Sequence, residues 1–178
     1  MPVDKWTYSV RGEVLPDVLS KGLDVVFCGS AAGEHSARAA AYYAGPGNRF
    51  WPTLFEIGLL PERIQPPAFR CVLQYGLGLT DLAKETAGSD VALSVADYDT
   101  KGLRKKIDEF EPRLLAFNGK RAASLFLRRQ VAYGLQDDVL GRTHVYVLPS
   151  TSGAARRFWH VEPWCELVDW LKKENCIR

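Results

Sequence analysis

Four apolar segments of strand length recur along the chain, and two of them end in glycine. Residues 23–29, 113–119 and 143–149 are rich in Val, Leu and Phe, and residues 76–82 form a similar segment that carries Asp81 near its end. Runs of this length and composition are typical of buried strands in a parallel sheet. The pattern therefore predicts a strand in each of these four segments.

Segments with helical character lie between and after these strands. Residues 34–41 are rich in alanine, a strong helix former, and residues 94–108 and 120–129 are also expected to be largely helical. Asn48 can cap a helix that runs through Gly58. We expect loops at residues 42–48, 61–69 and 86–90 and an arm with a short helix at residues 1–22. The last helix is expected to bury a face formed by Val161, Trp164, Leu167, Val168 and Leu171.

This alternation of strands and helices continues over the whole chain. It predicts a single α/β domain, residues 1–178, with a core at residues 23–173, a mainly parallel sheet and helices on both faces. In such folds, ligands bind at the carboxyl ends of the strands. The candidate site therefore contains the residues at these strand ends, which are Gly29–Gly33, Asp81, Asn118–Gly119 and Pro149–Gly153.

Composition narrows the class of protein. The chain has 178 residues, of which 47% are hydrophobic and 25% charged, values that suit one globular domain. No apolar run is long enough to span a membrane and no secretory signal is present, so we expect a cytoplasmic protein with no membrane partner. A net charge of +2 excludes DNA binding by overall basicity, so any positive charge used for DNA must be local.

Cofactor signals are weak throughout the sequence. The cysteines form no Cys-x-x-Cys pair, and the three histidines lack the spacing of metal ligands, so we expect no metal site. The segment Gly29–Gly33 matches neither a dinucleotide-binding fingerprint nor a phosphate-binding loop with Lys-Ser/Thr. We therefore expect no cofactor.

Each strand end supports a functional and a structural interpretation. Gly29–Gly33 can present backbone N–H groups to an anion, or it can simply turn the chain into the next helix. Asp81 can accept an N–H from a ligand or orient a water, or it can cap a helix. Tyr42-Tyr43 beside Gly45-Pro46-Gly47 can offer a stacking platform, or it can form a surface loop. Ser150–Arg157 can bind phosphates, or it can form a solvated turn.

Taken together, five segments resemble the uracil-DNA glycosylase superfamily, most closely its mismatch-specific uracil/thymine-DNA glycosylase branch. The resemblance covers roughly residues 23–173 and implies a three-layer α/β/α sandwich around a short, mainly parallel sheet. The order and separation of the segments match as well. They are Val25–Gly29, Gly45–Trp51, Tyr75–Asp81, Pro112-Arg113 with Phe117–Lys120, and Leu148–Ser152.

The resemblance implies an enzyme that flips a nucleotide out of DNA and hydrolyses its N-glycosidic bond. Tyr43 would stack on the flipped base, Asp81 stands at the base-recognition position, and Ser150–Ser152 would bind the flanking phosphates. The implied base-binding set is Gly29, Ser30, Ala31, Ala32, Gly33, Tyr43, Asn48 and Asn118. The implied DNA-binding set is Gly45, Pro46, Gly47, Ser150, Thr151, Ser152, Gly153, Ala154, Ala155, Arg156 and Arg157.

One position departs from the related branch in a way that affects the chemistry. That branch has asparagine in its first motif, where this chain has Ala31, and an alanine cannot orient water. The water must then be held elsewhere. Asp81, Glu34 and His35 are the catalytic candidates, with Asn48 as a fourth.

The identity of the excised base is left open by the same residues. A carboxylate at Asp81 accepts the N3–H of uracil and disfavours cytosine, but hypoxanthine also offers an N–H beside a carbonyl. Gly29-Ser30, Tyr42-Tyr43 and Leu148–Ser152 are also similar to the hypoxanthine-DNA glycosylase branch. We expect a monomeric, monofunctional enzyme that acts on uracil in DNA. The alternatives are a hypoxanthine/xanthine-DNA glycosylase, a damaged-DNA binding module without catalysis and an enzyme of small nucleosides, which would not need the Ser150–Arg157 loop.

Overall fold

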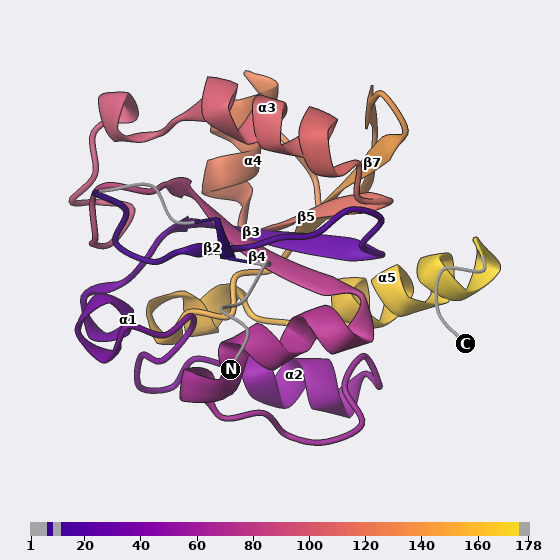
Figure 1. The fold of residues 1–178 in the computed structure, drawn as a ribbon, viewed down its shortest axis with the longest axis horizontal. Helices are drawn as coiled ribbons and strands as arrows, with labels where there is room; N and C mark the ends of the chain where they lie inside the picture. The colour runs from indigo at the N-terminus through magenta and orange to yellow at the C-terminus, as the bar shows by residue number, and fades with distance from the viewer. Residues whose placement is uncertain (1–6, 9–11, 175–178) are drawn as a thin grey trace.

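A seven-stranded sheet runs through the centre of the molecule (Figure 1). The computed structural model describes residues 7–8 and 12–174, and its strand order is β1-β2-β4-β3-β5-β7-β6. The four central strands β4, β3, β5 and β7 are mutually parallel, whereas β1, β2 and β6 pair antiparallel at the two sides. The strands are β1 (Thr7–Tyr8), β2 (Asp17–Val18), β3 (Val25–Ala31), β4 (Leu77–Ala83), β5 (Leu114–Asn118), β6 (Gly134–Leu140) and β7 (Thr143–Leu148).

Helices cover both faces of this sheet and complete a three-layer sandwich (Figure 1). One layer contains α3 (Thr100–Phe110) and α4 (Lys120–Leu127); the other contains α2 (Phe50–Glu56), the 3₁₀ helix η1 (Pro66–Tyr75) and α5 (Glu162–Lys173). The remaining helices are α1 (Glu34–Ala39), η2 (Val95–Asp97) and η3 (Gly153–Phe158). The predicted α/β/α fold is therefore confirmed. None of the described helices is long and apolar enough to cross a membrane.

Alternating side chains of β3 build the two halves of the core, because successive residues of a strand point to opposite faces. Phe27 packs on one face between Phe50 of α2 and Trp164 of α5, with ring centroids 5.3 and 5.7 Å away. Val26 and Cys28 belong to the cluster on the other face, beneath α3 and α4. The central strand is thus buried on both sides and holds its carboxyl end rigidly.

Most predicted elements are present, and the errors lie outside the four apolar strands. The short helix expected within residues 1–22 is wrong for residues 12–22, which contain β2 instead. The loop expected at residues 61–69 is wrong from Pro66 onward, where η1 begins. The helix expected at residues 94–108 is interrupted at residues 98–99 between η2 and α3. β6 was not expected, because an edge strand with the sequence Gly-Leu-Gln-Asp-Asp-Val-Leu lacks an apolar run.

Candidate active site

A cleft of about 810 Å³ opens at the carboxyl ends of the parallel strands. Parallel strands end at the same edge of the sheet, so segments far apart in the sequence meet there. The walls come from the end of β3 and the start of α1, the loop after α1, the end of β4, the start of α4 and the segment after β7. The lining includes Gly29–Ser36, Tyr42, Tyr43, Gly45, Pro46, Asn48, Asp81, Gly88–Ala92, Asn118–Arg121, Tyr133, Ser150–Ala155 and Phe158.

Asp81 is the buried carboxylate of this cleft and lies against Gly29. The two residues are register partners on the adjacent strands β3 and β4. A Cβ atom at position 29 would collide with Oδ1 of Asp81. Asp81 is only 5% exposed. Glycine at position 29 therefore provides the space that the carboxylate occupies.

Burial changes the acid–base chemistry of Asp81. It raises the pKa of this carboxyl to about 7, because removal from water penalises the charged form, while the nearby charge of Lys84 opposes the shift. A group with this pKa exists in both protonation states at neutral pH. It can therefore accept a proton during a reaction, as a general base requires.

Tyr43 forms an aromatic wall of the cleft and has an unusual backbone conformation. Its φ is 56°, and its ring stacks on Phe50 with a centroid distance of 3.8 Å and an interplanar angle of 24°. Among the described residues, its buried hydroxyl has no hydrogen bond of standard geometry. Burial and the nearby Asp81 raise the pKa of Tyr43 well above its usual value, and the Asn118 side chain opposes this. Phe50, itself buried in the core, therefore holds the Tyr43 ring firmly.

Asn118 connects the end of β5 to the segment after β7. Its Nδ2 donates to Thr151 Oγ1 at 2.8 Å, and its Oδ1 accepts from the Thr151 N–H at 3.0 Å. The Thr151 carbonyl in turn accepts from the N–H of Arg49 at 2.9 Å. A Cβ at Gly153 would lie 2.8 Å from the carbonyl oxygen of Pro46. The two predicted DNA-binding loops are thus in close contact with each other.

The other residues predicted to hold the attacking water, Glu34, His35 and Asn48, also line this cleft. Glu34 and His35 are the first residues of α1 and are exposed. Asn48 accepts a hydrogen bond from the N–H of Phe50, the first residue of α2, at 3.0 Å; the N-cap position itself is occupied by Arg49, so the cap predicted at Asn48 is one residue too early. Of these candidates and Asp81, only Asp81 is buried. Gly47, Arg156 and Arg157 do not line the cleft, and the two arginines are exposed on η3.

Several lining residues were not anticipated from the sequence. Phe158 is a large apolar side chain that is 66% exposed at the cleft, and Val91 is 97% exposed. Lys120 Nζ lies 4.1 Å from the ring centroid of Tyr133, and both residues line the cleft. Tyr133 lies in the connection between α4 and β6, and it was missed because it does not follow a predicted parallel strand. In the sequence, Phe158 could be suspected of a role at the cleft only because it follows the basic residues Arg156 and Arg157.

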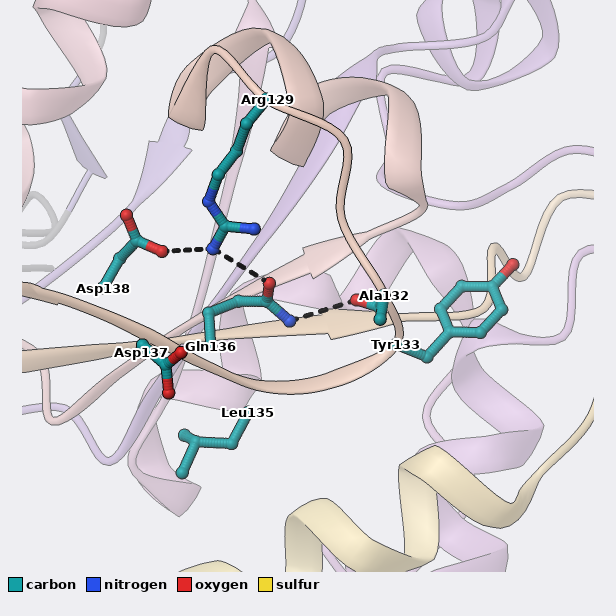
Figure 2. Close-up of a pocket in the computed structure, with 7 residues that line it drawn as sticks. All are labelled: Arg129, Ala132, Tyr133, Leu135, Gln136, Asp137 and Asp138. Carbon is teal, nitrogen blue, oxygen red and sulfur yellow. Dashed lines mark hydrogen bonds and ion pairs between the residues drawn. The ribbon is translucent and has the colours of Figure 1, made fainter.

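A smaller cavity of about 430 Å³ lies beside β6 and shares Tyr133 with the cleft (Figure 2). Its polar side chains bind one another: Arg129 pairs with Asp138, and it donates to Gln136 at 3.2 Å. Gln136 also donates to the carbonyl of Ala132 at 3.0 Å.

In the described part of the chain, no group of three or more His, Cys, Asp or Glu side chains could hold a metal ion.

Comparison with known proteins assigns the chain to a family. The model of the uracil DNA glycosylase superfamily matches residues 16–171, which is most of the chain. The chain belongs to the uracil DNA glycosylase superfamily. The matched region begins before β2, so the segment that carries Asp17 is part of the superfamily domain.

A solved structure supports the same fold for this superfamily member. The chain is similar to the solution NMR structure of a proposed uracil DNA glycosylase from Methanosarcina acetivorans, with 24% identity and a TM-score of 0.57. The similarity covers 86% of this chain and 96% of that one. Membership in a superfamily of DNA glycosylases makes DNA the partner of this protein.

Proposed function

We propose that this protein is a monofunctional uracil-DNA glycosylase, which flips uracil out of DNA and hydrolyses its N-glycosidic bond. The single observation that carries the proposal is the buried carboxylate of Asp81 beside the Tyr43 ring in the strand-end cleft. The superfamily match gives the class of reaction, and the name of the superfamily and of the similar structure supports uracil as the base. The cleft supplies a place for a flipped nucleotide.

Base binding uses the wall formed by β3 and Tyr43. One face of the Tyr43 ring packs on Phe50, and the residue lines the cleft. The flipped base stacks on the Tyr43 ring, and its polar edge faces the backbone of Gly29–Gly33. Stacking on an aromatic ring contributes about 1–3 kcal/mol per base.

Asp81 is the group that activates the water in this proposal. In its ionised form, the carboxylate accepts a proton from a water molecule, whose oxygen forms a bond to C1′ of the sugar. The C1′–N bond breaks, and its electron pair leaves with the base as an anion, which is then protonated. The carboxylate also stabilises the positive charge that develops on the sugar. Glu34 and His35 are exposed and the side-chain oxygen of Asn48 accepts the N–H of Phe50, so Asp81 is the best placed of the four candidates.

The contacts of the lysines near the cleft support a monofunctional reaction. A glycosylase that also cleaves the strand uses an amine to form a Schiff base with C1′. Lys120 is the lysine that lines the cleft, and its ammonium lies over the ring of Tyr133. Lys84 is buried and paired with Asp17. The proposed products are therefore an abasic site in an intact strand and a free base.

DNA contacts come from the loops that surround the cleft. The hydroxyl oxygens of Ser150 and Ser152 accept from backbone N–H groups of the same segment, which leaves each O–H to donate to a phosphate oxygen. Residues 153–155 are Gly-Ala-Ala, which have no side chain large enough to fill the gap left by a flipped nucleotide. Phe158 is exposed at the same cleft, and apolar side chains of this size can enter a base stack. We assign the gap-filling role to Phe158.

Hypoxanthine is a second candidate base, because a cleft of about 810 Å³ is large enough for a purine as well as a pyrimidine. The proposal is tested by single-turnover reactions on oligonucleotides that contain one uracil, hypoxanthine, xanthine or thymine mispair, followed by alkaline cleavage. Uracil is expected to be excised fastest, without strand cleavage before alkali. Absence of product on every substrate, together with tight binding to uracil-containing DNA, would instead establish a binding module.

A further inference from the structure

The hydroxyl of Tyr43 is a buried polar group for which the described part of the chain provides no hydrogen bond of standard geometry. The Asn118 amide interacts with it, but both ends of that amide are already bonded to Thr151. A buried hydroxyl without a partner destabilises a fold, and a phenylalanine at this position would stack on Phe50 without that cost. The hydroxyl therefore indicates a partner that binds in the cleft.

This hydroxyl lies beside the Asp81 carboxylate, in front of Gly29. Tyr43 Oη is 3.5 Å from the position that a Cβ atom at Gly29 would take, and Asp81 Oδ1 would collide with an atom at that same position. The two oxygens are therefore at most about 6 Å apart, a separation that one water molecule can bridge with hydrogen bonds of about 2.9 Å. All three residues line the cleft, so a water held between them borders the space for a flipped nucleotide.

The backbone of Tyr43 supports a functional role for the side chain. Its φ of 56° lies in the left-handed region, and strained conformations of this kind concentrate at active sites and ligand-binding sites. Within the described ranges, the other non-glycine residues with positive φ are C-caps of helices, namely Ala40, Glu111 and Arg128. Tyr43 caps no helix, and its ring is held against Phe50. The hydroxyl is thus directed at one place.

We propose that the Tyr43 hydroxyl and the Asp81 carboxylate together hold the attacking water. This inference rests on the proposed function, in which Asp81 accepts a proton from that water. Burial and the nearby Asp81 keep the pKa of Tyr43 well above its usual value, so the hydroxyl keeps its proton and donates to the water oxygen. The water donates to Asp81 and retains a lone pair for the bond to C1′. Ala31, on the same face of β3 as Gly29, has no polar side chain that could bind this water.

Tyr43→Phe tests the proposal, because it removes the hydroxyl and keeps the ring that stacks on Phe50 and on the base. In single-turnover excision of uracil from duplex DNA, the maximal rate is expected to fall at least about tenfold, with the half-saturating enzyme concentration within about twofold of the wild type. An unchanged maximal rate would overturn the proposal. A loss confined to the half-saturating concentration would also overturn it, since the hydroxyl would then contact the base and not the water.

Tyr98→Phe is the matched control. In the described part of the chain, the Tyr98 hydroxyl is also buried without a hydrogen bond of standard geometry, and Tyr98 does not line the cleft. The same atom is removed, and the excision rate is expected to stay within about twofold of the wild type. An equal fall in both variants would show a general effect of losing a buried hydroxyl and would count against the proposal.

A high-resolution crystal structure of the wild-type protein tests the water site without any reaction, even if Tyr43→Phe does not fold. An ordered water is expected within hydrogen-bond distance of both Tyr43 Oη and Asp81 Oδ1. A direct hydrogen bond between these two atoms, or a space without water, would overturn the proposal. The assay of the wild type separates this inference from the proposed function. A wild type that excises no base refutes both, whereas full activity in Tyr43→Phe refutes this inference alone.

Discussion

The Asp81 carboxylate occupies the space that a side chain at Gly29 would fill. The two residues pair across β3 and β4, so the absence of a Cβ on one strand creates the binding space for the acid on the other. Gly29 is therefore a part of the proposed active site that contributes space and no functional group. Its effect on the reaction should be visible only through Asp81.

Gly29→Ala is expected to lower the single-turnover rate of base excision more than tenfold, because the new methyl group displaces the carboxylate. A tenfold loss corresponds to about 1.4 kcal/mol in the barrier. A double-mutant cycle with Asp81→Ala provides the control. If the methyl group acts by displacing Asp81, Gly29→Ala costs little further activity in the Asp81→Ala background. Full additivity of the two losses would disprove the link between these residues.

Asp81→Asn is expected to make the folded protein more stable at pH 8 while it abolishes most of the activity. The pKa of Asp81 rises from 3.8 to about 7 on folding, so the folded state binds its proton more tightly than the unfolded state does. Stability is therefore lost as the pH rises from about 4 to about 7, by up to about 4 kcal/mol. The neutral amide avoids this loss.

Urea unfolding of the wild type and Asp81→Asn at pH 5 and pH 8 measures this difference. The gain in the free energy of unfolding should be large at pH 8 and should shrink at pH 5. A variant that is less stable than the wild type at pH 8 would show that the ionised carboxylate is compensated in the folded state, contrary to our account.

Phe158→Ala is expected to slow excision from double-stranded DNA at least tenfold and to leave excision from single-stranded DNA nearly unchanged. The reason is that a single strand has no base stack to be filled when the nucleotide is flipped. Phe55→Ala is the matched control, since Phe55 is 43% exposed on α2 and does not line the cleft. An equal loss of excision rate on double- and single-stranded DNA would show that Phe158 does not fill the gap in the duplex.

Asn118→Ala is expected to weaken DNA binding more than it slows the chemical step. The substitution removes both hydrogen bonds between Asn118 and Thr151, and leaves the loop held there only by the backbone hydrogen bond from the N–H of Arg49 to the Thr151 carbonyl. Titration of excision rate against enzyme concentration should show a several-fold increase in the half-saturating concentration. A loss confined to the maximal rate would instead show that Asn118 acts in the chemical step, by contacting the flipped base or the attacking water.

The parallel core of the fold could be predicted from the sequence because its strands are apolar on both faces. Phe27 and Phe117 lie in such strands, and Asp81 was predicted near the carboxyl end of a third apolar strand, β4. Polar segments that become buried could not be found this way. Asp17 looks like a surface residue in the sequence, yet it pairs with Lys84 and Lys106 in the interior.

The limits of prediction at the site have the same origin. Tyr133 and Phe158 reach the cleft only through the tertiary arrangement of the α4–β6 connection and η3. The sequence suggested several holders for the water in place of Ala31, and burial alone distinguishes Asp81 from Glu34 and His35. The burial of a polar side chain such as Asp81 depends on the folded chain and has no local signal in the sequence.

The central claim is that ionised Asp81 drives the excision of uracil, and the pH dependence of the single-turnover rate tests it most directly. Because the pKa of Asp81 is raised to about 7, the rate on uracil-containing DNA should rise through an apparent pKa near 7 and level off above it. In Asp81→Asn the residual rate should lack this inflection. A wild-type rate that is flat from pH 5 to pH 9, or an inflection that persists in Asp81→Asn, would contradict the account.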